Sequence, residues 1–144
     1  MNKIEHIGIA VKDIEKSNKL FASLFNRKPY KQEEVKSEHV ITSFFETGES
    51  KIELLQATHE DSAIAKFIDK KGEGIHHIAF DVTDIHEELE RLEKEGFRII
   101  TKTPKKGADN KIVAFLHPKS TNGVLIELCQ EIDKKINQLK GSKL

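Results

Sequence analysis

Four residues of this 144-residue sequence have the types and the spacing of a metal site. His6 and Glu53 lie in the first half of the chain, and His77 and Glu127 occupy corresponding places in the second half. Two neutral imidazoles and two carboxylates form a mixed nitrogen and oxygen donor set that suits Co²⁺, Ni²⁺, Zn²⁺, Mn²⁺ or Fe²⁺. The sequence therefore predicts a divalent metal site to which each half contributes one histidine and one glutamate.

An internal repeat places these four residues. Residues 4–14 read IEHIGIAVKDI, and residues 75–85 repeat the pattern as IHHIAFDVTDI. The segment KIELLQ at 51–56 returns as LIELCQ at 125–130. Related units of roughly 70 residues would each be marginally stable alone, so we expect one shared domain over residues 1–130. Its expected parts are module one at about 1–58, a linking helix at about 60–71, module two at about 74–130, and then a charged tail at 131–144 with apolar residues at helical spacing.

Strand periodicity predicts that both histidines share a face with small residues. Alternation puts His6 on the face of Gly8 and His77 on the face of Ala79, which leaves space beside each ring. A glutamate inside an apolar strand is costly to bury without a partner, and a cation would supply that partner in both halves. His76 falls on the opposite, apolar face and is interpreted as structural. The remaining histidines considered are expected at the surface: His39, His59 and His86.

Both halves are expected to run strand, helix, then further strands. Asp13 is a plausible N-cap for a helix that runs to about Phe25. Thr83 or Asp84 is expected to cap a second helix, which Gly96 terminates. A linking helix between the halves should close near Gly72. The expected strands are 4–11, 40–46 and 51–56 with a short strand near 30–35 in the first half, and 75–82, 97–100, 112–116 and 124–129 in the second.

Composition excludes several classes of partner. The chain has 24 basic and 24 acidic residues, well interspersed, so neither nucleic acid nor a membrane surface is an expected partner. No apolar run reaches transmembrane length, and the N-terminus lacks the apolar region of a signal peptide. Cys129, the one cysteine in the sequence, either lines the pocket or acts as a small buried hydrophobe. A reducing, cytoplasmic setting is the expected location.

Five segments resemble the methylmalonyl-CoA epimerases of the vicinal oxygen chelate superfamily, which also contains glyoxalases, bleomycin resistance proteins and dioxygenases. The first segment, around His6, is generic to the superfamily. The stretch that runs from His117-Pro118 through Glu127 is more specific to the epimerases. The resemblance covers essentially residues 4–130. The segments are His6–Val11, Lys51–Leu55, Ser62–Phe67, Gly74–Phe80 and Phe115–Leu128.

The resemblance implies an α+β fold in which two repeated βαβββ modules form a curved mixed sheet around a metal site, the glyoxalase-like fold. It carries over His6, His77 and Glu127 as metal ligands. Glu53 falls at the fourth ligand position, which is glutamine in some members. The expected cofactor is a divalent ion, with Co²⁺ first and Zn²⁺, Ni²⁺ or Mn²⁺ as alternatives. A homodimer is also expected by resemblance.

The implied reaction interconverts the 2R and 2S forms of methylmalonyl-CoA. An α-proton would be removed to give a metal-stabilised enolate and returned from the other face. Glu127 is the hypothesised first proton carrier and Glu53 the second. Some family members place an extra glutamate base where this chain has Thr42, which is therefore expected to line the substrate site. Lys119 and Ser120 are candidate contacts for coenzyme A, although a simple turn explains them equally well.

Other functions use related ligand sets. A glyoxalase I-type enzyme acting on a glutathione hemithioacetal would share the ligands, but the segment around Glu127 favours the epimerases. A ring-opening dioxygenase would bind Fe²⁺ through two histidines and one glutamate, which leaves Glu53 unexplained. A non-enzymatic small-molecule-binding relative would not need the metal ligands, and such binders favour aromatic grooves, whereas this chain has no Trp and one Tyr.

Overall fold

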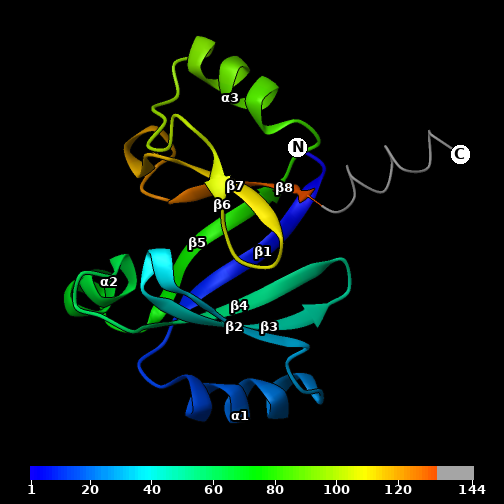
Figure 1. Ribbon diagram of the computed structural model, residues 1–144, viewed down its shortest axis with the longest axis vertical. Coiled ribbons are helices and arrows are strands. Elements are labelled where there is room, and N and C mark those ends of the chain that lie inside the picture. Colours follow the sequence, from blue (N-terminus) through cyan, green and yellow to red (C-terminus); the bar gives the residue numbers. More distant parts are fainter. Residues whose placement is uncertain (133–144) are drawn as a thin grey trace, which may run out of the picture. The chain divides into compact units, whose positions relative to one another are not determined.

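The computed structural model describes residues 1–132, which fall into two compact units (Figure 1). One unit is Ile4–Ile78, and the other joins Met1–Lys3 to the chain from Ala79 onward. The boundary falls inside a strand, so that strand contributes to both units. The C-terminal tail with helical spacing lies, apart from its first two residues, outside the described part of the chain. No helix among residues 1–132 is long and apolar enough to cross a membrane.

The unit Ile4–Ile78 is built on a mixed sheet. Its strand order is β2-β3-β4-β1-β5, with β1 parallel to β4 and with β2, β3 and β4 antiparallel in turn. This order confirms the strands expected in the first half, including the short one. The elements are β1 (Lys3–Ala10), α1 (Ile14–Phe25), β2 (Lys31–Val35), a 3-10 turn (Lys36–Glu38), β3 (Val40–Thr47), β4 (Ser50–Ala57), α2 (Ala63–Lys71) and the first part of β5 (Gly74–Asp81).

Helix α1 covers one face of this sheet. Its N-cap is Asp13, as predicted, and the Asp13 carboxylate accepts a hydrogen bond from the backbone N–H of Lys16. Phe21 and Phe25 of the helix pack against Phe45 of β3, with ring centroids 6.4 and 5.6 Å apart respectively. The helix therefore buries the face of β3 and β4 on which the odd residues of β3 lie.

Helix α2 packs against the opposite face. Ser62 is its N-cap, and Ile64 packs with Ala10 of β1 and Leu55 of β4. Successive side chains of a strand point to opposite faces, so Glu53 shares the α2 face with Leu55. The candidate metal ligands of this unit thus lie on the face that α1 leaves uncovered.

The second unit contains the matching elements of the repeat. Strands β6, β7 and β8 pair antiparallel, and α3 packs with Leu89 and Leu92 against Ala114 of β7 and Leu128 of β8. Glu127, between the α3-facing Ile126 and Leu128, points to the other face of β8. The elements are the end of β5, α3 (Ile85–Lys94), β6 (Lys105–Lys106), β7 (Lys111–Leu116), a 3-10 turn (Pro118–Ser120) and β8 (Ile126–Glu131).

Both units use the same junction between strand and helix, which confirms the duplication read from the sequence. In the first, the Ile14 N–H donates to Gln56 Oε1 at 2.6 Å and the Val11 N–H donates to the Leu55 carbonyl at 2.9 Å. Each junction is thus closed by the residues two and three places after the repeated glutamate. The counterparts are Ile85 N–H to Gln130 Oε1 at 2.9 Å and Val82 N–H to the Cys129 carbonyl at 2.9 Å.

Two strand predictions in the second half are wrong: one strand does not form, and another begins at a different residue. Residues 97–100 form no strand, and a single bridge joins Ile99 to Leu116. The Ile100 and Thr101 N–H groups both donate to the Phe115 carbonyl, so the regular alternation of a ladder is lost there. Strand β8 begins two residues later than predicted, because the Val124 N–H closes a turn onto the Thr121 carbonyl.

Candidate metal centre

The two repeated histidines of the unit Ile4–Ile78 meet through their Nε2 atoms. His6 on β1 and His77 on β5 are both buried, and their Nε2 atoms lie 3.0 Å apart. The two rings are nearly perpendicular, with an interplanar angle of 86°. Because neighbouring strands β1 and β5 hold them, the matched positions in the sequence become adjacent positions on one sheet face.

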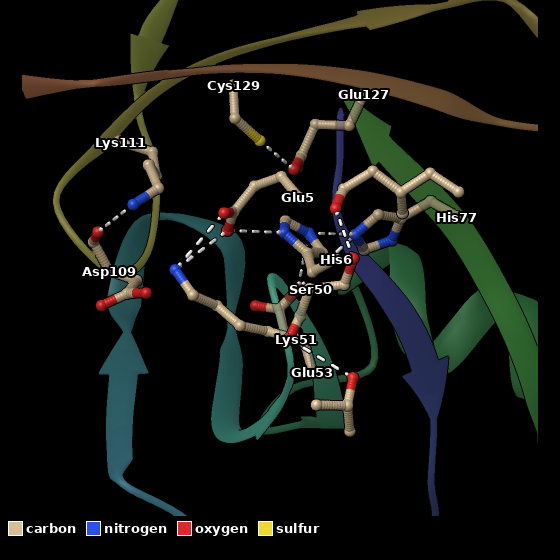
Figure 2. Close-up of polar contacts among 12 residues, drawn as sticks. Glu5, His6, Ser50, Lys51, Glu53, His77, Asp109, Lys111, Glu127 and Cys129 are labelled. Carbon is tan, nitrogen blue, oxygen red and sulfur yellow. Dashed lines mark hydrogen bonds and ion pairs between the residues drawn. The ribbon is translucent and has the colours of Figure 1, made fainter. Parts of the chain in front are cut away.

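Glu53 of β4 completes a triangle of donor atoms. Its Oε1 lies 3.3 Å from the Nε2 of His6 and 3.5 Å from the Nε2 of His77 (Figure 2). Donor atoms bound to one ion at about 2.0–2.2 Å are separated by roughly 3.0–3.6 Å, for octahedral or tetrahedral angles respectively. The three separations, 3.0, 3.3 and 3.5 Å, match that spacing, so these three residues fit a divalent ion.

The electrostatics of Glu53 also suit a ligand. Burial raises the pKa of its carboxyl. The charge of His6, the hydrogen bonds from His6 and His77, and the charge of His77 lower this pKa, and together they outweigh burial. The pKa ends at about 2. The carboxylate is therefore ionised at neutral pH and held by the same nitrogen atoms that would share a cation with it.

Gly8 makes room for this arrangement. A Cβ built at position 8 would lie 2.1 Å from Cε1 of His77, much closer than any real contact. Gly8 also pairs with Glu53 in the register of β1 and β4. The alternation of the strands predicted space beside each histidine, and at Gly8 the imidazole ring of His77 fills that space.

Two polar residues beside the histidines were missed by the sequence reasoning. Glu5 is buried, with its Oε1 3.4 Å from Nδ1 of His6 and its Oε2 3.3 Å from Nζ of Lys51 (Figure 2). His76, interpreted as structural, lies with its Nδ1 2.9 Å from Nδ1 of His77. The available signal was positional, because each of these residues directly precedes a predicted ligand.

Glu127 lies in the other unit, on β8. It is buried, and the Sγ of Cys129 donates to its Oε2 at 2.9 Å. Phe115 stands opposite it in the register of β7 and β8. Cys129 is thus more than a small hydrophobe, since its thiol orients a predicted ligand. Glu127 is a carboxylate of the type and burial that a metal ligand needs.

Comparison with protein families decides the relationship. The sequence model of the Glyoxalase/Bleomycin resistance protein/Dioxygenase superfamily matches residues 5–115. The chain belongs to this superfamily. The match runs from β1 into β7, so it includes His6, Glu53 and His77, and it confirms the predicted fold class.

Relatives within the superfamily confirm the resemblance to epimerases and the predicted enzyme class, an isomerase. The chain is 42% identical over 133 residues to mitochondrial methylmalonyl-CoA epimerase of Dictyostelium discoideum, across 89% of this chain and 78% of that protein. It is 36% identical over 132 residues to ethylmalonyl-CoA/methylmalonyl-CoA epimerase of Cereibacter sphaeroides, across 90% and 98%. A structure of methylmalonyl-CoA epimerase in complex with methylmalonyl-CoA and NH4+ superposes with a TM-score of 0.86 at 31% identity, across 92% and 96%.

The residues expected to meet substrate in an epimerase-like site are already hydrogen-bonded locally. Thr42 of β3 is buried, and its hydroxyl donates to the Glu33 carbonyl at 3.4 Å. It stands opposite Leu55, so it shares the sheet face of Glu53. This face of β3 therefore carries a hydroxyl next to β4, the strand that contains Glu53.

The loop before β8 is closed on itself. The hydroxyl of Ser120 donates to the His117 carbonyl at 2.9 Å and accepts from the Arg98 N–H at 3.2 Å. The Lys119 N–H donates to Nδ1 of His117 at 3.0 Å, while the Lys119 side chain is exposed. Desolvation, then the positive charges of Arg98 and Lys119, lower the pKa of His117. Two cations, Arg98 and Lys119, therefore lie near enough to His117 to disfavour its protonated form.

Proposed function

We propose that this protein interconverts (2R)- and (2S)-methylmalonyl-CoA with the help of a bound divalent metal ion. The observation that carries the proposal is the triangle of donor atoms from His6, Glu53 and His77, in a chain whose relatives are named methylmalonyl-CoA epimerases. A small-molecule binder would have no use for that donor set, because binding alone does not require a Lewis acid.

The ligand set of the proposed centre combines both halves of the repeat. His6, His77 and Glu127 would hold the ion, with Glu53 as the fourth ligand. Two carboxylates would balance the charge of a divalent ion. The bound ion would supply positive charge that stabilises the negative charge developing on the thioester oxygen. Co²⁺ is the proposed ion, since this donor set suits it, and Zn²⁺, Ni²⁺ and Mn²⁺ are the alternatives to be tested.

The protein's own carboxylates would move the proton. Inversion at the α-carbon requires one group to take the proton and another to deliver one from the opposite face. We assign removal to Glu127, whose carboxylate accepts the α-proton while the C–H electron pair moves into the enolate. Delivery from the other face is assigned to Glu53. Glu53 would first gain a proton from solvent water, and Glu127 would return its proton to water after each turnover, so that both carboxylates are restored.

Substrate positioning is assigned to three further residues. Thr42 would contact the malonyl part, because it lies on the face of Glu53. Lys119 and Ser120 would contact coenzyme A, and the positive charge gathered around His117 supports a phosphate at that loop. A homodimer in the cytoplasm is the proposed working form.

The test is proton exchange measured beside inversion. The purified protein, loaded with Co²⁺ or stripped by a chelator, would be incubated with methylmalonyl-CoA in D₂O. NMR would follow loss of the α-proton signal, and a coupled assay would follow inversion. Metal-dependent exchange with inversion is the expected result. Absence of exchange with any divalent ion would reject the proposal and would direct the test to a glutathione hemithioacetal.

A further inference from the structure

Each histidine of the centre has a polar partner on the ring nitrogen that faces away from the donor triangle. Nδ1 of His6 lies 3.4 Å from Oε1 of Glu5, and Nδ1 of His77 lies 2.9 Å from Nδ1 of His76. Glu5 and His76 occupy the same position of the repeat, directly before the ligand. The duplication therefore conserved the place of the partner in the two halves while its chemistry changed.

The chemistry of an imidazole ligand explains what such a partner does. A ring that binds a metal through Nε2 must carry its proton on Nδ1, and an acceptor at Nδ1 fixes both that tautomer and the ring angle. The Glu5 carboxylate can accept from His6. His76 can accept at Nδ1 in the neutral tautomer that carries its proton on Nε2.

We propose that Glu5 and His76 are positioning residues that hold His6 and His77 with Nε2 directed at the metal, and that the two ligands are inequivalent because one partner is a carboxylate and the other an imidazole. The inference rests on the proposed function only through the metal. It concerns how the chain orients its metal ligands, and it is valid for any substrate.

The surroundings of Glu5 support a fixed carboxylate at this place. Its residue is 3% exposed, and Nζ of Lys51 lies 3.3 and 3.4 Å from its two oxygens (Figure 2). A buried carboxylate without a cation would be costly, and Lys51 offsets that cost. Lys51 also pairs with His6 in the register of β1 and β4. The pairing of these two strands therefore brings Lys51 beside both His6 and Glu5.

The surroundings of His76 fix its ring by packing. The His76 ring meets the ring of Phe67 edge-on, with centroids 5.0 Å apart and an interplanar angle of 85°. Lys71, one turn further along α2, has its Nζ 5.8 Å from the centroid of the Phe67 ring. The linking helix thus holds the imidazole that holds His77. An aromatic residue of similar shape would keep this packing but would lose the acceptor.

Paired substitutions separate the acceptor from the packing. Glu5→Gln keeps an acceptor but removes the charge, whereas Glu5→Leu removes both. His76→Gln offers another acceptor, whereas His76→Phe keeps the ring shape without one. Exposed positions supply matched controls: Glu34→Gln, Glu34→Leu and His86→Phe.

The first readout is Co²⁺ affinity, measured by competition with a chromophoric chelator in the absence of substrate. Loss of an outer partner of a ligand histidine weakens metal binding by about 10–100-fold. We expect about tenfold for Glu5→Gln and for His76→Phe, more for Glu5→Leu, and no change for the Glu34 and His86 controls. His76→Gln should retain more affinity than His76→Phe.

The second readout is the ring tautomer, from ¹⁵N-histidine spectra of the Zn²⁺-loaded protein. His6 and His77 should both carry the proton on Nδ1, and Glu5→Leu should change the Nδ1 signal of His6 while that of His77 stays. A merely structural role would lower the melting temperature of the chelator-treated protein and leave these signals unchanged. Wild-type Co²⁺ affinity in both Glu5→Leu and His76→Phe would overturn the inference. Metal binding without epimerisation would instead overturn the proposed function and leave the inference standing.

Discussion

The two glutamates of the repeat have the same sequence context but different surroundings. Glu53 lies in the unit Ile4–Ile78, where its partners are the imidazoles of His6 and His77. Glu127 lies in the other unit, where the Cys129 thiol donates to it. The residue two places after each glutamate differs accordingly, since Leu55 is packed among apolar side chains and Cys129 provides a donor. A duplicated segment can therefore keep its glutamate while the residues around that glutamate diverge.

A parallel contrast holds at the residue two places after each histidine. Gly8 has no space for a Cβ because the His77 ring fills it, whereas the matching Ala79 carries a Cβ in a fully buried cluster with Val113 and Cys129. The same position of the repeat thus admits a methyl group in one half and forbids it in the other. Each of the following experiments tests one side of these contrasts.

The largest effect on metal binding is expected for Gly8→Ala. The new Cβ would lie 2.1 Å from Cε1 of His77, so that ring must move out of the donor triangle. We expect Co²⁺ affinity to fall by at least about 100-fold, at the upper end of effects on ligand orientation. Isothermal titration with Co²⁺ measures it. The reciprocal variant, Ala79→Gly, should lower stability by up to about 1 kcal/mol and leave affinity within a few fold. Equal affinities in the two variants would refute the contrast.

Glu53→Gln should separate proton exchange from inversion. The amide can remain near the metal but cannot deliver a proton, so inversion should fall by about 10²–10⁴-fold. With the epimer whose α-proton faces Glu127 as substrate, exchange in D₂O should persist, because the proposed base for that proton is intact and can trade its proton with water. Glu127→Gln should instead abolish exchange of that same epimer as well as inversion.

Both rates come from the NMR and coupled assays on Co²⁺-loaded protein, with metal content measured in each sample. Identical behaviour of the Glu53→Gln and Glu127→Gln variants would show that the two glutamates have not diverged in role. Full turnover of Glu127→Gln with its metal retained would remove that residue from the proton path.

A smaller effect is expected for Cys129→Ala, which removes the thiol donor and only one heavy atom of the buried side chain. Losing one hydrogen bond to Glu127 is worth about 0.5–1.5 kcal/mol, so turnover should fall by roughly 3–10-fold. Co²⁺ affinity should change less than turnover. The matched control is Leu55→Val in the other half, where no donor is lost. An equal fall in turnover in both variants would mean that the thiol acts through packing alone.

The smallest effect concerns acid stability without metal. The pKa of Glu53 in the folded chain, about 2, is below its ordinary value of 4.5. Its contribution to stability is therefore fully present above about pH 4.5 and is lost as the pH falls toward 2. Chelator-treated wild-type protein should lose free energy of unfolding more steeply in this window than Glu53→Gln does. Denaturant titrations at several pH values measure the difference, and parallel curves would contradict it.

Much of the fold could be predicted because its signals are local. The predicted cap residues Asp13 and Asp84 begin helices in the structure, and the period-two patterns mark β1, β4 and β5. The segment 97–100 failed for the opposite reason. Its apolar residues suit a strand, but its hydrogen bonds depend on Phe115, which is distant in the sequence.

The candidate ligands could be predicted from the sequence, but the residues that contact and orient those ligands could be predicted only in part. A histidine and a glutamate at matched places pointed to His6, Glu53 and His77, which the structure brings together. Glu5 was missed because its importance comes from Lys51 across the sheet, a contact of two segments that no local pattern reveals. The role of Glu127 is a prediction that the variants above test, and the roles of Thr42, Lys119 and Ser120 in binding stay predictions.

The sequence by itself determined the duplication, the order of the elements and the identity of the candidate ligands, because repeats, periodicity and residue chemistry are written along the chain. Only the tertiary structure decided which atoms meet. It alone shows that Nε2 of each histidine faces the other and Glu53, that Nδ1 faces Glu5 or His76, and that Gly8 is required by a ring 69 positions away. These contacts depend on the register and pairing of strands, which are set by the packing of the whole sheet.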